Sequence, residues 1–226
     1  MSAPYYSDEH VTLYHGDCRD LTEWVDCDVL VTDPPYGIRW DCSMTSYHRG
    51  VATTRRAVTI AGDRDTAARD AVLAMWGDRP AVVFGSWRAP RPQAVRHRLV
   101  WDKRGMAPGP VRAPFMTMDE EIYILGAGFR SSSPPQRSVI ATHEARSRAV
   151  REVGHPIPKP LGLMEILIGR CPAGAVADPF AGTGTTLVAA RALGRTAVGV
   201  EIDERYCELA ARRLSQGVLD LTSLTA

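Results

Sequence analysis

A pattern of strand, turn, helix and strand near the C-terminus constrains the fold of this 226-residue chain more than any other feature. Residues 174–180 form a short apolar run that ends in Asp-Pro-Phe and predicts a buried strand. The turn Ala-Gly-Thr-Gly-Thr-Thr follows at residues 181–186, and residues 185–193 predict a helix. Residues 196–202 predict a second buried strand, and residues 203–214 predict the helix after it. Two buried strands joined by a helix begin a doubly wound, mostly parallel sheet.

The rest of the chain also alternates strands and helices, which predicts an α/β fold with helices on both faces of the sheet. Residues 37–56 are expected to form a polar, Arg-containing loop. Residues 126–154 are rich in Ser, Pro and Arg and break the pattern, so they are expected to be an insertion at the sheet edge. One domain is then expected from residues 1–125 and 155–226. Further strands are predicted at residues 11–14, 29–32, 81–84, 97–101 and 121–125, and further helices at residues 65–76 and 161–168.

Composition excludes several classes of protein. Hydrophobic residues make up 45% of the chain and charged residues 23%, which is typical of a globular protein and not of a disordered one. No apolar run approaches the ~18 residues of a membrane span, and the polar, acidic N-terminus does not resemble a signal peptide. Five scattered cysteines without a CxxC pair favour neither disulfides nor a metal site, so a reducing, cytoplasmic location is expected.

The formal net charge of +1 conceals an uneven distribution. Residues 1–36 hold eight acids and one base, whereas residues 37–115 hold 14 bases and six acids. The basic span is compatible with a groove for a polyanion. The basic residues comprise 25 Arg and only two Lys, Lys103 and Lys159. A lysine retained against this background is expected to do something that arginine cannot.

The tetrapeptide Asp33-Pro34-Pro35-Tyr36 follows a predicted buried strand, where ligands of open α/β sheets bind. Such a tetrapeptide suits the alkylation of an exocyclic amine, because two acceptors that hold the amino hydrogens free the nitrogen lone pair. The Asp33 carboxylate and the Pro34 carbonyl are the two candidate acceptors, and the prolines fix the backbone around them. Tyr36 offers a ring on which a nucleobase can stack. These four residues are the predicted catalytic group.

The glycine turn predicts a nucleoside cofactor. Gly182 and Gly184 permit a tight turn and the close approach of a ligand, and the N–H groups that open the next helix suit a carboxylate or phosphate. Glu201 ends the next strand, where an acid reaches ribose hydroxyls in nucleoside-binding sheets. The third glycine of the dinucleotide fingerprint is absent, which disfavours a pyrophosphate and favours S-adenosylmethionine.

The tetrapeptide and the glycine turn together resemble those of the DNA amino-methyltransferases, S-adenosylmethionine enzymes that act on adenine N6 or cytosine N4. The tetrapeptide precedes the cofactor motif, and this order resembles the β group. It implies a circularly permuted Rossmann-like methyltransferase fold in which residues 126–154 form a short target-recognition segment. The resemblance covers most of the chain and includes Tyr14-His-Gly-Asp-Cys18, residues 82–86, 101–103 and 119–122, His155-Pro156 and Lys159-Pro160.

The resemblance implies that the target base is extruded from double-stranded DNA and stacked on Tyr36. It places Asp17 at the cofactor adenine and Lys159 beside the methionine end of the cofactor. The expected cofactor-binding residues are Asp17, Cys18, Asp33, Lys159, Asp178, Phe180, Gly182, Gly184, Thr185, Glu201 and Ile202.

Arginines are the expected contacts to DNA phosphates. The recognition segment is small, so either the DNA site that it reads is short or a restriction or specificity partner contributes. Enzymes of the permuted group are often dimers, so the resemblance implies a homodimer. The expected DNA-binding residues are Arg39, Arg49, Arg55 and Arg56 in the loop after the tetrapeptide, and Arg130, Arg137, Arg146 and Arg148 in the recognition segment.

The first residue of the tetrapeptide bears on the substrate. Asp at position 33 resembles the adenine-N6 enzymes, whereas Ser at this position is typical of the cytosine-N4 enzymes. A site-specific methyltransferase for adenine N6 in DNA is therefore expected. A cytosine-N4 enzyme is one alternative, and a DNA-binding regulatory subunit with a partner-dependent site is another.

Overall fold

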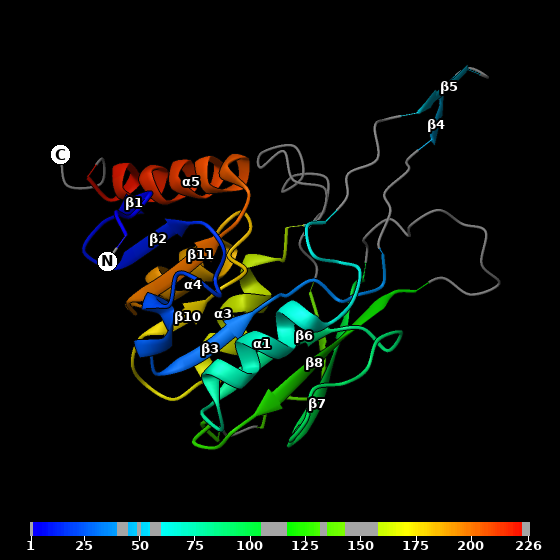
Figure 1. Ribbon diagram of the computed structural model, residues 1–226, viewed down its shortest axis with the longest axis horizontal. Coiled ribbons are helices and arrows are strands. Elements are labelled where there is room, and N and C mark those ends of the chain that lie inside the picture. The colour runs from blue at the N-terminus through cyan, green and yellow to red at the C-terminus, as the bar shows by residue number, and fades with distance from the viewer. Residues whose placement is uncertain are drawn as a thin grey trace.

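The protein is an α/β domain built around one nine-stranded sheet (Figure 1). The computed structural model describes residues 2–39, 45–48, 51–54, 60–104, 117–131, 135–142 and 158–222. The strands lie in the order β1-β2-β11-β10-β3-β6-β8-β7-β9. Their bounds are β1 Tyr6–Ser7, β2 Val11–His15, β3 Val29–Thr32, β6 Ala81–Gly85, β7 His97–Asp102, β8 Asp119–Leu125, β9 Val139–Ala141, β10 Val176–Asp178 and β11 Ala197–Glu201.

The centre of the sheet is parallel, and its antiparallel strands lie toward the two ends. Strands β2, β11, β10, β3 and β6 run parallel to one another, so their carboxyl ends share one edge. Strand β8 runs antiparallel to both β6 and β7, and β1 runs antiparallel to β2. All four residues of β3 are buried, as expected for a strand covered on both faces.

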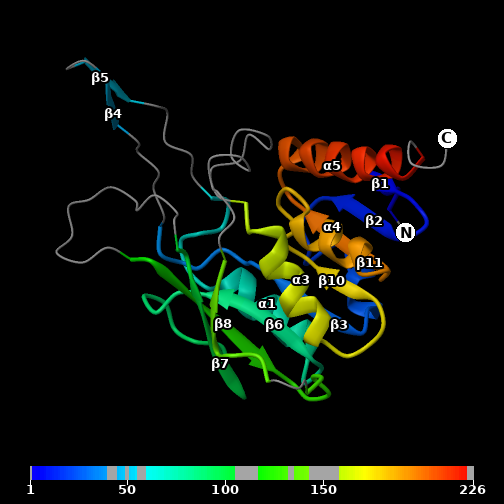
Figure 2. The ribbon, with the colours of Figure 1, turned by 180° about the vertical axis from the view of Figure 1, so that it is seen from behind.

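Helices cover both faces of the sheet (Figures 1 and 2). Helix α1 (Ala67–Trp76) and the 3₁₀ helix η1 (Glu23–Asp26) contribute to the apolar core of one face. Helices α3 (Leu161–Arg170), α4 (Thr185–Ala192) and α5 (Glu204–Thr222) contribute to the core of the other face. None of these helices, within the described part of the chain, is long and apolar enough to cross a membrane.

Side chains at helical spacing fill the two cores. Trp24 from η1 and Trp76 from α1 stack on one face, with their ring centroids 6.1 Å apart. On the other face, α3 buries Leu163, Leu167 and Ile168, and because Leu167 and Ile168 follow Leu163 by four and five residues, all three lie on one side of the helix. Burial of three aliphatic side chains of this size contributes roughly 5–9 kcal/mol, so α3 is held firmly against the sheet.

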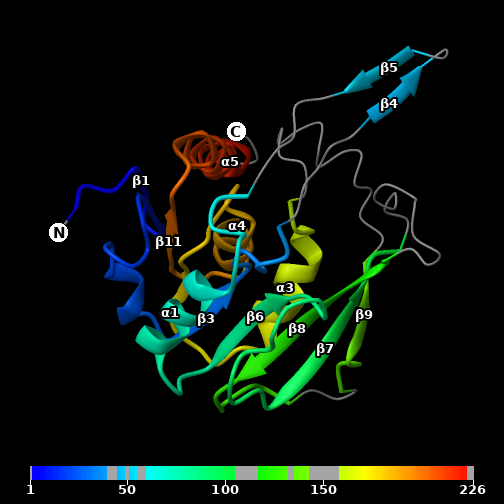
Figure 3. The same ribbon diagram turned by 45° about the vertical axis from the view of Figure 1, so that its right-hand side comes forward.

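The predicted strands and helices are largely present, with three corrections. Strand β10 is shorter than the predicted residues 174–180, because Pro179 has no N–H to donate to a sheet ladder. The polar loop predicted at residues 37–56 contains two strands, β4 (Thr45–His48) and β5 (Val51–Thr54), which pair antiparallel beyond the edge of the main sheet (Figure 3). Helix α5 continues past the predicted end at Leu214 to Thr222.

Strand β9 lies within residues 126–154, the segment predicted as an insertion. It pairs parallel with β7, with Trp101 opposite Ile140, and so extends the main sheet by one edge strand. A three-residue strand is too short to show a period, which is why the sequence pattern missed it. The assignment of the whole segment to target recognition stays a prediction.

Candidate functional site

The parallel strands bring the two sequence motifs to the same edge of the sheet. Thr32 ends β3 directly before Asp33, and Asp178 ends β10 three residues before the glycine turn begins at Ala181. Strands β3 and β10 are neighbours in the sheet, with Val176 opposite Val29 and Ala177 opposite Leu30. The tetrapeptide and the turn are therefore adjacent in space, although residues 37–180 separate them in the chain.

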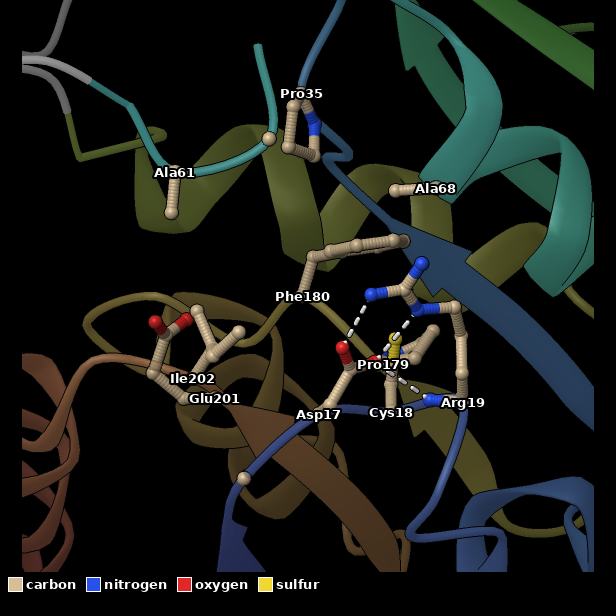
Figure 4. Close-up of a pocket in the computed structure, with 12 residues that line it drawn as sticks. Asp17, Cys18, Arg19, Pro35, Ala61, Ala68, Pro179, Phe180, Glu201 and Ile202 are labelled. Carbon is tan, nitrogen blue, oxygen red and sulfur yellow. Dashed lines mark hydrogen bonds and ion pairs between the residues drawn. The ribbon is translucent and has the colours of Figure 1, made fainter.

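A cavity opens at this edge, between the ends of β2, β10 and β11 (Figure 4). Five predicted cofactor residues line it, whereas Gly182, Gly184, Thr185, Asp178, Asp33 and Lys159 do not. Pro35 of the tetrapeptide forms part of the same wall, so the cavity borders directly on the predicted catalytic group. Its lining residues are Gly16, Asp17, Cys18, Arg19, Pro35, Ala61, Gly62, Ala68, Pro179, Phe180, Glu201 and Ile202.

Glu201 fixes one side of the cavity. Its carboxylate accepts hydrogen bonds from the backbone N–H of Gly182, at 2.7 Å, and from that of Asp203, at 2.8 Å. Burial raises the pKa of Glu201, while the two backbone donors favour its ionised form. A carboxylate offers about four lone-pair positions, so Glu201 retains acceptor capacity for hydroxyl groups. It holds the glycine turn and faces the cavity at the same time.

Asp17 also lines the cavity, and it is paired with Arg19 (Figure 4). The Arg19 backbone N–H and its Nε each donate to Asp17 Oδ1 at 2.9 Å. These hydrogen bonds to Arg19 lower the pKa of Asp17 and keep the carboxylate ionised. Arg19 was not predicted as a site residue, and its position two residues after Asp17 is the only signal in the sequence for this pairing.

Arg213 on α5 holds the glycine turn in place through hydrogen bonds. The Arg213 guanidinium donates to the Thr183 carbonyl at 2.5 Å and to the hydroxyl oxygens of Thr183 and Thr185 at 3.2 and 3.1 Å. Gly184 has a positive φ of 75°, and a Cβ there would lie 2.9 Å from Ala210 Cβ. Glycine is therefore required at this position for both backbone and packing reasons. Thr185 faces Arg213 and supports the turn from outside the cavity.

Asp178 lies beneath the turn and is 2% exposed. It accepts a hydrogen bond from the Thr32 hydroxyl at 2.7 Å and one from the Phe180 N–H at 3.2 Å. Burial raises its pKa to about 7, against hydrogen bonds from Thr186, Thr32 and Phe180 that favour the ionised form. The structure thus places Asp178 as a link between β10 and β3, whereas the sequence predicted a direct cofactor contact.

We expect an Asp178→Asn variant to be more stable than the wild type at pH 8, by about 4 kcal/mol, and nearly equal to it at pH 4. In the unfolded chain Asp178 loses its proton near 3.8, whereas the folded protein retains the proton up to about 7. Wild-type stability therefore falls as the pH rises through this window, and asparagine does not titrate. Urea unfolding at pH 4, 5.5, 7 and 8 measures the difference, and a difference independent of pH would contradict the prediction.

The tetrapeptide lies in a network of charged side chains beside the cavity. Asp33 Oδ1 accepts a hydrogen bond from the Tyr36 hydroxyl at 2.7 Å, and Asp33 Oδ2 pairs with Lys159 Nζ at 2.6 Å. Glu120 on β8 pairs with Lys159 at 2.9 Å and with Lys103 at 2.5 Å. Lys159 also donates to the Tyr36 hydroxyl oxygen at 3.1 Å, which closes a ring of contacts. The ammonium group of Lys159 thus contacts the tetrapeptide, and the position beside the cofactor that the resemblance implies for Lys159 stays a prediction.

Burial and charge act against each other in this network. Burial disfavours the ionised form of Glu120, but Lys159 and Lys103 outweigh it and lower the pKa of Glu120 to about 2. Burial also works against the charge on Lys159, yet Asp33 and Glu120 raise its pKa. The pKa of Tyr36 is raised well above 10, first by burial and then by Asp33 and Glu120. At neutral pH Glu120 is therefore a carboxylate, Lys159 an ammonium group and Tyr36 a neutral phenol.

Sequence reasoning missed Glu120 and Arg213 as parts of the site. The resemblance included residues 101–103 and 119–122, but only as middle strands of the sheet. The sequence feature that bears on Glu120 is the presence of only two lysines among 25 arginines. In the structure both of these lysines pair with the Glu120 carboxylate. Arg213 carried no signal, because an arginine on an amphipathic helix is ordinarily a solvated side chain.

Three of the predicted DNA-binding arginines lie in the described residues, and all three are exposed. Arg39 has a positive φ of 51° and its N–H donates to the Asp63 carbonyl, which shapes the loop after Tyr36. Arg130 and Arg137 lie before β9. Arg49, Arg55, Arg56, Arg146, Arg148 and the His155-Pro156 pair fall outside the described residues.

The sequence and the fold of this chain are similar to those of known proteins. The profile of the family N6_N4_Mtase, described as DNA methylase, matches residues 27–212. The Type II methyltransferase M.ScaI of Streptomyces caespitosus is 26% identical to this chain, over 95% of the chain and 84% of its own length.

Two solved structures share the fold at low sequence identity. The crystal structure of an M1.HpyAVI-SAM complex has a TM-score of 0.65 and 20% identity and covers 90% of this chain and 98% of its own. The PvuII DNA methyltransferase, described as cytosine-N4-specific, has a TM-score of 0.64 and 15% identity and covers 92% and 87%. These likenesses show a Rossmann-like α/β fold.

Proposed function

Because the chain belongs to the DNA methylase family N6_N4_Mtase, we propose that it transfers a methyl group from S-adenosylmethionine to N6 of adenine in double-stranded DNA. One observation carries the proposal. Pro35 lines the cavity, while its neighbours Asp33 and Tyr36 present a carboxylate and an aromatic ring beside it. A methyl donor in the cavity and an amino group at Asp33 would meet at the tetrapeptide.

The lining of the cavity suits S-adenosylmethionine. Asp17 and Glu201 offer carboxylate acceptors for ribose and adenine groups, and Phe180 with Ile202 offers apolar walls for a flat ring. Ile202 is 52% exposed and lines the cavity, so it offers an apolar surface to a ligand there. When bound, the cofactor supplies an electrophilic methyl group.

The tetrapeptide orients the acceptor nitrogen. The Asp33 carboxylate and the Pro34 carbonyl accept the two amino hydrogens, so the nitrogen lone pair points away from the base ring and toward the methyl donor. Tyr36 provides the ring on which the extruded base stacks. Transfer then depends mainly on orientation and exclusion of water, and the nitrogen releases its proton once the new C–N bond has formed.

The position of the charges suggests how DNA is held. Arg39 lies directly after the tetrapeptide, and Arg130 and Arg137 precede the edge strand β9. We infer that these exposed guanidinium groups contact phosphates and that residues 126–154 read the recognition sequence. The short length of this segment favours a short recognition site, a second copy of the chain or a specificity partner.

The experiment is a transfer assay with labelled S-adenosylmethionine and plasmid DNA that carries no methylated bases, followed by nucleoside analysis. Label in N6-methyladenine supports the proposal. Label in N4-methylcytosine would show that the substrate is cytosine and not adenine. The site allows this outcome, because an exocyclic amine on either base can bind Asp33. Failure to bind cofactor in calorimetry would favour a regulatory subunit with a partner-dependent site.

A further inference from the structure

The network of charged side chains beside the tetrapeptide includes one carboxylate that neither lines the cavity nor belongs to the tetrapeptide. Glu120, near the start of β8, is the only carboxylate in the described residues that pairs with both lysines of the chain. Its Oε1 lies 2.5 Å from Lys103 Nζ and its Oε2 lies 2.9 Å from Lys159 Nζ. The same Oε2 lies 3.0 Å from the Tyr36 hydroxyl.

The oxygens of Asp33 are already engaged in this state of the protein. The Tyr36 hydroxyl donates to Oδ1 and Lys159 pairs with Oδ2. Each oxygen keeps a second lone-pair position, but a target amino group that approaches Asp33 must share the negative charge of the carboxylate with these two donors and is held less strongly. The competition is strong, because Lys159 is only 9% exposed and a desolvated ammonium group keeps its partners unless it gains another acceptor.

Glu120 offers an alternative acceptor to both of these donors. Its Oε2 is within 3.0 Å of the Tyr36 hydroxyl and of Lys159 Nζ, the same two groups that occupy Asp33. The Tyr36 hydroxyl has one proton and can donate it to one carboxylate at a time. Small rotations of the phenol O–H and of the lysine ammonium would transfer both donors from Asp33 to Glu120.

We propose that Glu120 is a positioning residue that takes over the Tyr36 hydroxyl and the Lys159 ammonium when the target base enters, and so frees Asp33 to bind the amino group. The inference rests on the proposed function, since it concerns the same transfer. Lys103 pairs with Oε1 of Glu120, the oxygen that contacts neither Tyr36 nor Lys159, and so keeps this carboxylate ionised and in place. The two lysines can serve here where arginine cannot, because an ammonium group pivots between acceptors and a planar guanidinium does not.

The test is a Glu120→Gln variant, which keeps the shape of the side chain and removes its charge. We expect the single-turnover rate of methyl transfer to fall about 100-fold, because the acceptor group at Asp33 stays occupied. The cofactor dissociation constant should stay within about 3-fold of the wild type, since Glu120 does not line the cavity. Glu120→Asp keeps the charge and should recover to within about 10-fold of the wild-type rate.

The neighbouring residue supplies a matched control. Glu121 is a buried carboxylate on the same strand, but it pairs with Arg91 at 2.9 Å and Arg98 at 3.1 Å and is not part of the network. Glu121→Gln also removes a buried charge and should keep the transfer rate within about 3-fold. If Glu121→Gln slows transfer as much as Glu120→Gln, the effect is general destabilisation and the inference is overturned.

The remaining outcomes separate this inference from the proposed function. A Glu120→Gln protein that transfers at the wild-type rate overturns the role of Glu120 and leaves the methyltransferase assignment intact. A wild-type protein that methylates cytosine N4 leaves the role of Glu120 intact. A wild-type protein that methylates no DNA overturns both. If the thermal transition shows that Glu120→Gln does not fold, Lys103→Gln tests the same role, because it removes the ammonium group that pairs with Glu120. We expect Lys103→Gln to slow transfer about 10-fold. An unchanged rate would overturn the role of Glu120.

Discussion

An Asp33→Ala variant is expected to transfer methyl groups to DNA about 10³-fold more slowly than the wild type. The variant loses the charged acceptor that orients the target amino group, and alignment together with electrostatic stabilisation is worth effects of this size. Asp33 side-chain atoms do not line the cavity, so cofactor affinity should change little. Single-turnover incorporation of labelled methyl groups measures the first effect and calorimetry measures the second.

Asp33→Asn is the matched control for this prediction. It retains one acceptor oxygen and the side-chain shape but removes the charge that pairs with Lys159 at 2.6 Å. We expect an intermediate rate, about 10²-fold below the wild type. An Asp33→Ala protein that binds cofactor and labels DNA as fast as the wild type would exclude the proposed role of the tetrapeptide.

The second large effect is expected from Lys159→Met, which should lower the free energy of unfolding at pH 7 by about 3 kcal/mol. Lys159 is 9% exposed and contacts the carboxylates of both Asp33 and Glu120. Without the ammonium group, these two partly buried carboxylates, with Asp33 31% and Glu120 12% exposed, face each other across the Tyr36 hydroxyl. Transfer should also fall, because the pair takes up a proton and Asp33 no longer offers two acceptor oxygens.

The pH dependence of stability distinguishes Lys159→Met from a simple packing defect. In the wild type, Glu120 has a pKa of about 2 against an ordinary value of 4.5, so its contribution is complete above about pH 4.5 and is lost as the pH falls toward 2. In the variant, the carboxylate pair gains protons more readily when folded, so stability should rise as the pH falls from 8 to 5. Asp178 gives the wild type a slope of the same sign, so urea unfolding of both proteins across this range measures the difference in slope, and equal slopes would contradict the prediction.

Lys159→Arg separates charge from mobility at this position. Arginine retains the positive charge between the two carboxylates, so the wild-type pH dependence of stability should persist. Its planar guanidinium holds both partners at once, so transfer should still be slow. Wild-type transfer by Lys159→Arg would show that charge alone suffices.

The sequence predicted most of the sheet and helices, because their signals are local. A run such as Val-Leu-Val-Thr in β3 indicates a strand buried on both faces, and the glycine after α4 indicates where that helix ends. Strands β1 and β9 have two and three residues and exist only because a neighbouring strand pairs with them. Pairing of this kind is tertiary and leaves no period in the sequence.

The candidate site likewise has parts that the sequence predicted and parts that it did not. The tetrapeptide and the glycine turn are contiguous, so their residue types and spacing already indicated amine alkylation and a nucleoside cofactor. Whether Glu120 or Glu121 faces the tetrapeptide could not be predicted, because adjacent residues of a strand point to opposite faces and either register was open.

The sequence by itself thus determined the α/β class, the two motifs, their order and the singular status of two lysines among 25 arginines. Only the tertiary structure decided that both lysines meet at Glu120. The register of β7 against β8, with Asp102 opposite Asp119, brings Lys103 beside this carboxylate, and the segment before α3 brings Lys159 from the other side. The physical reason is that three segments distant in the chain share one desolvated space, where each charge is stable only in the presence of the others.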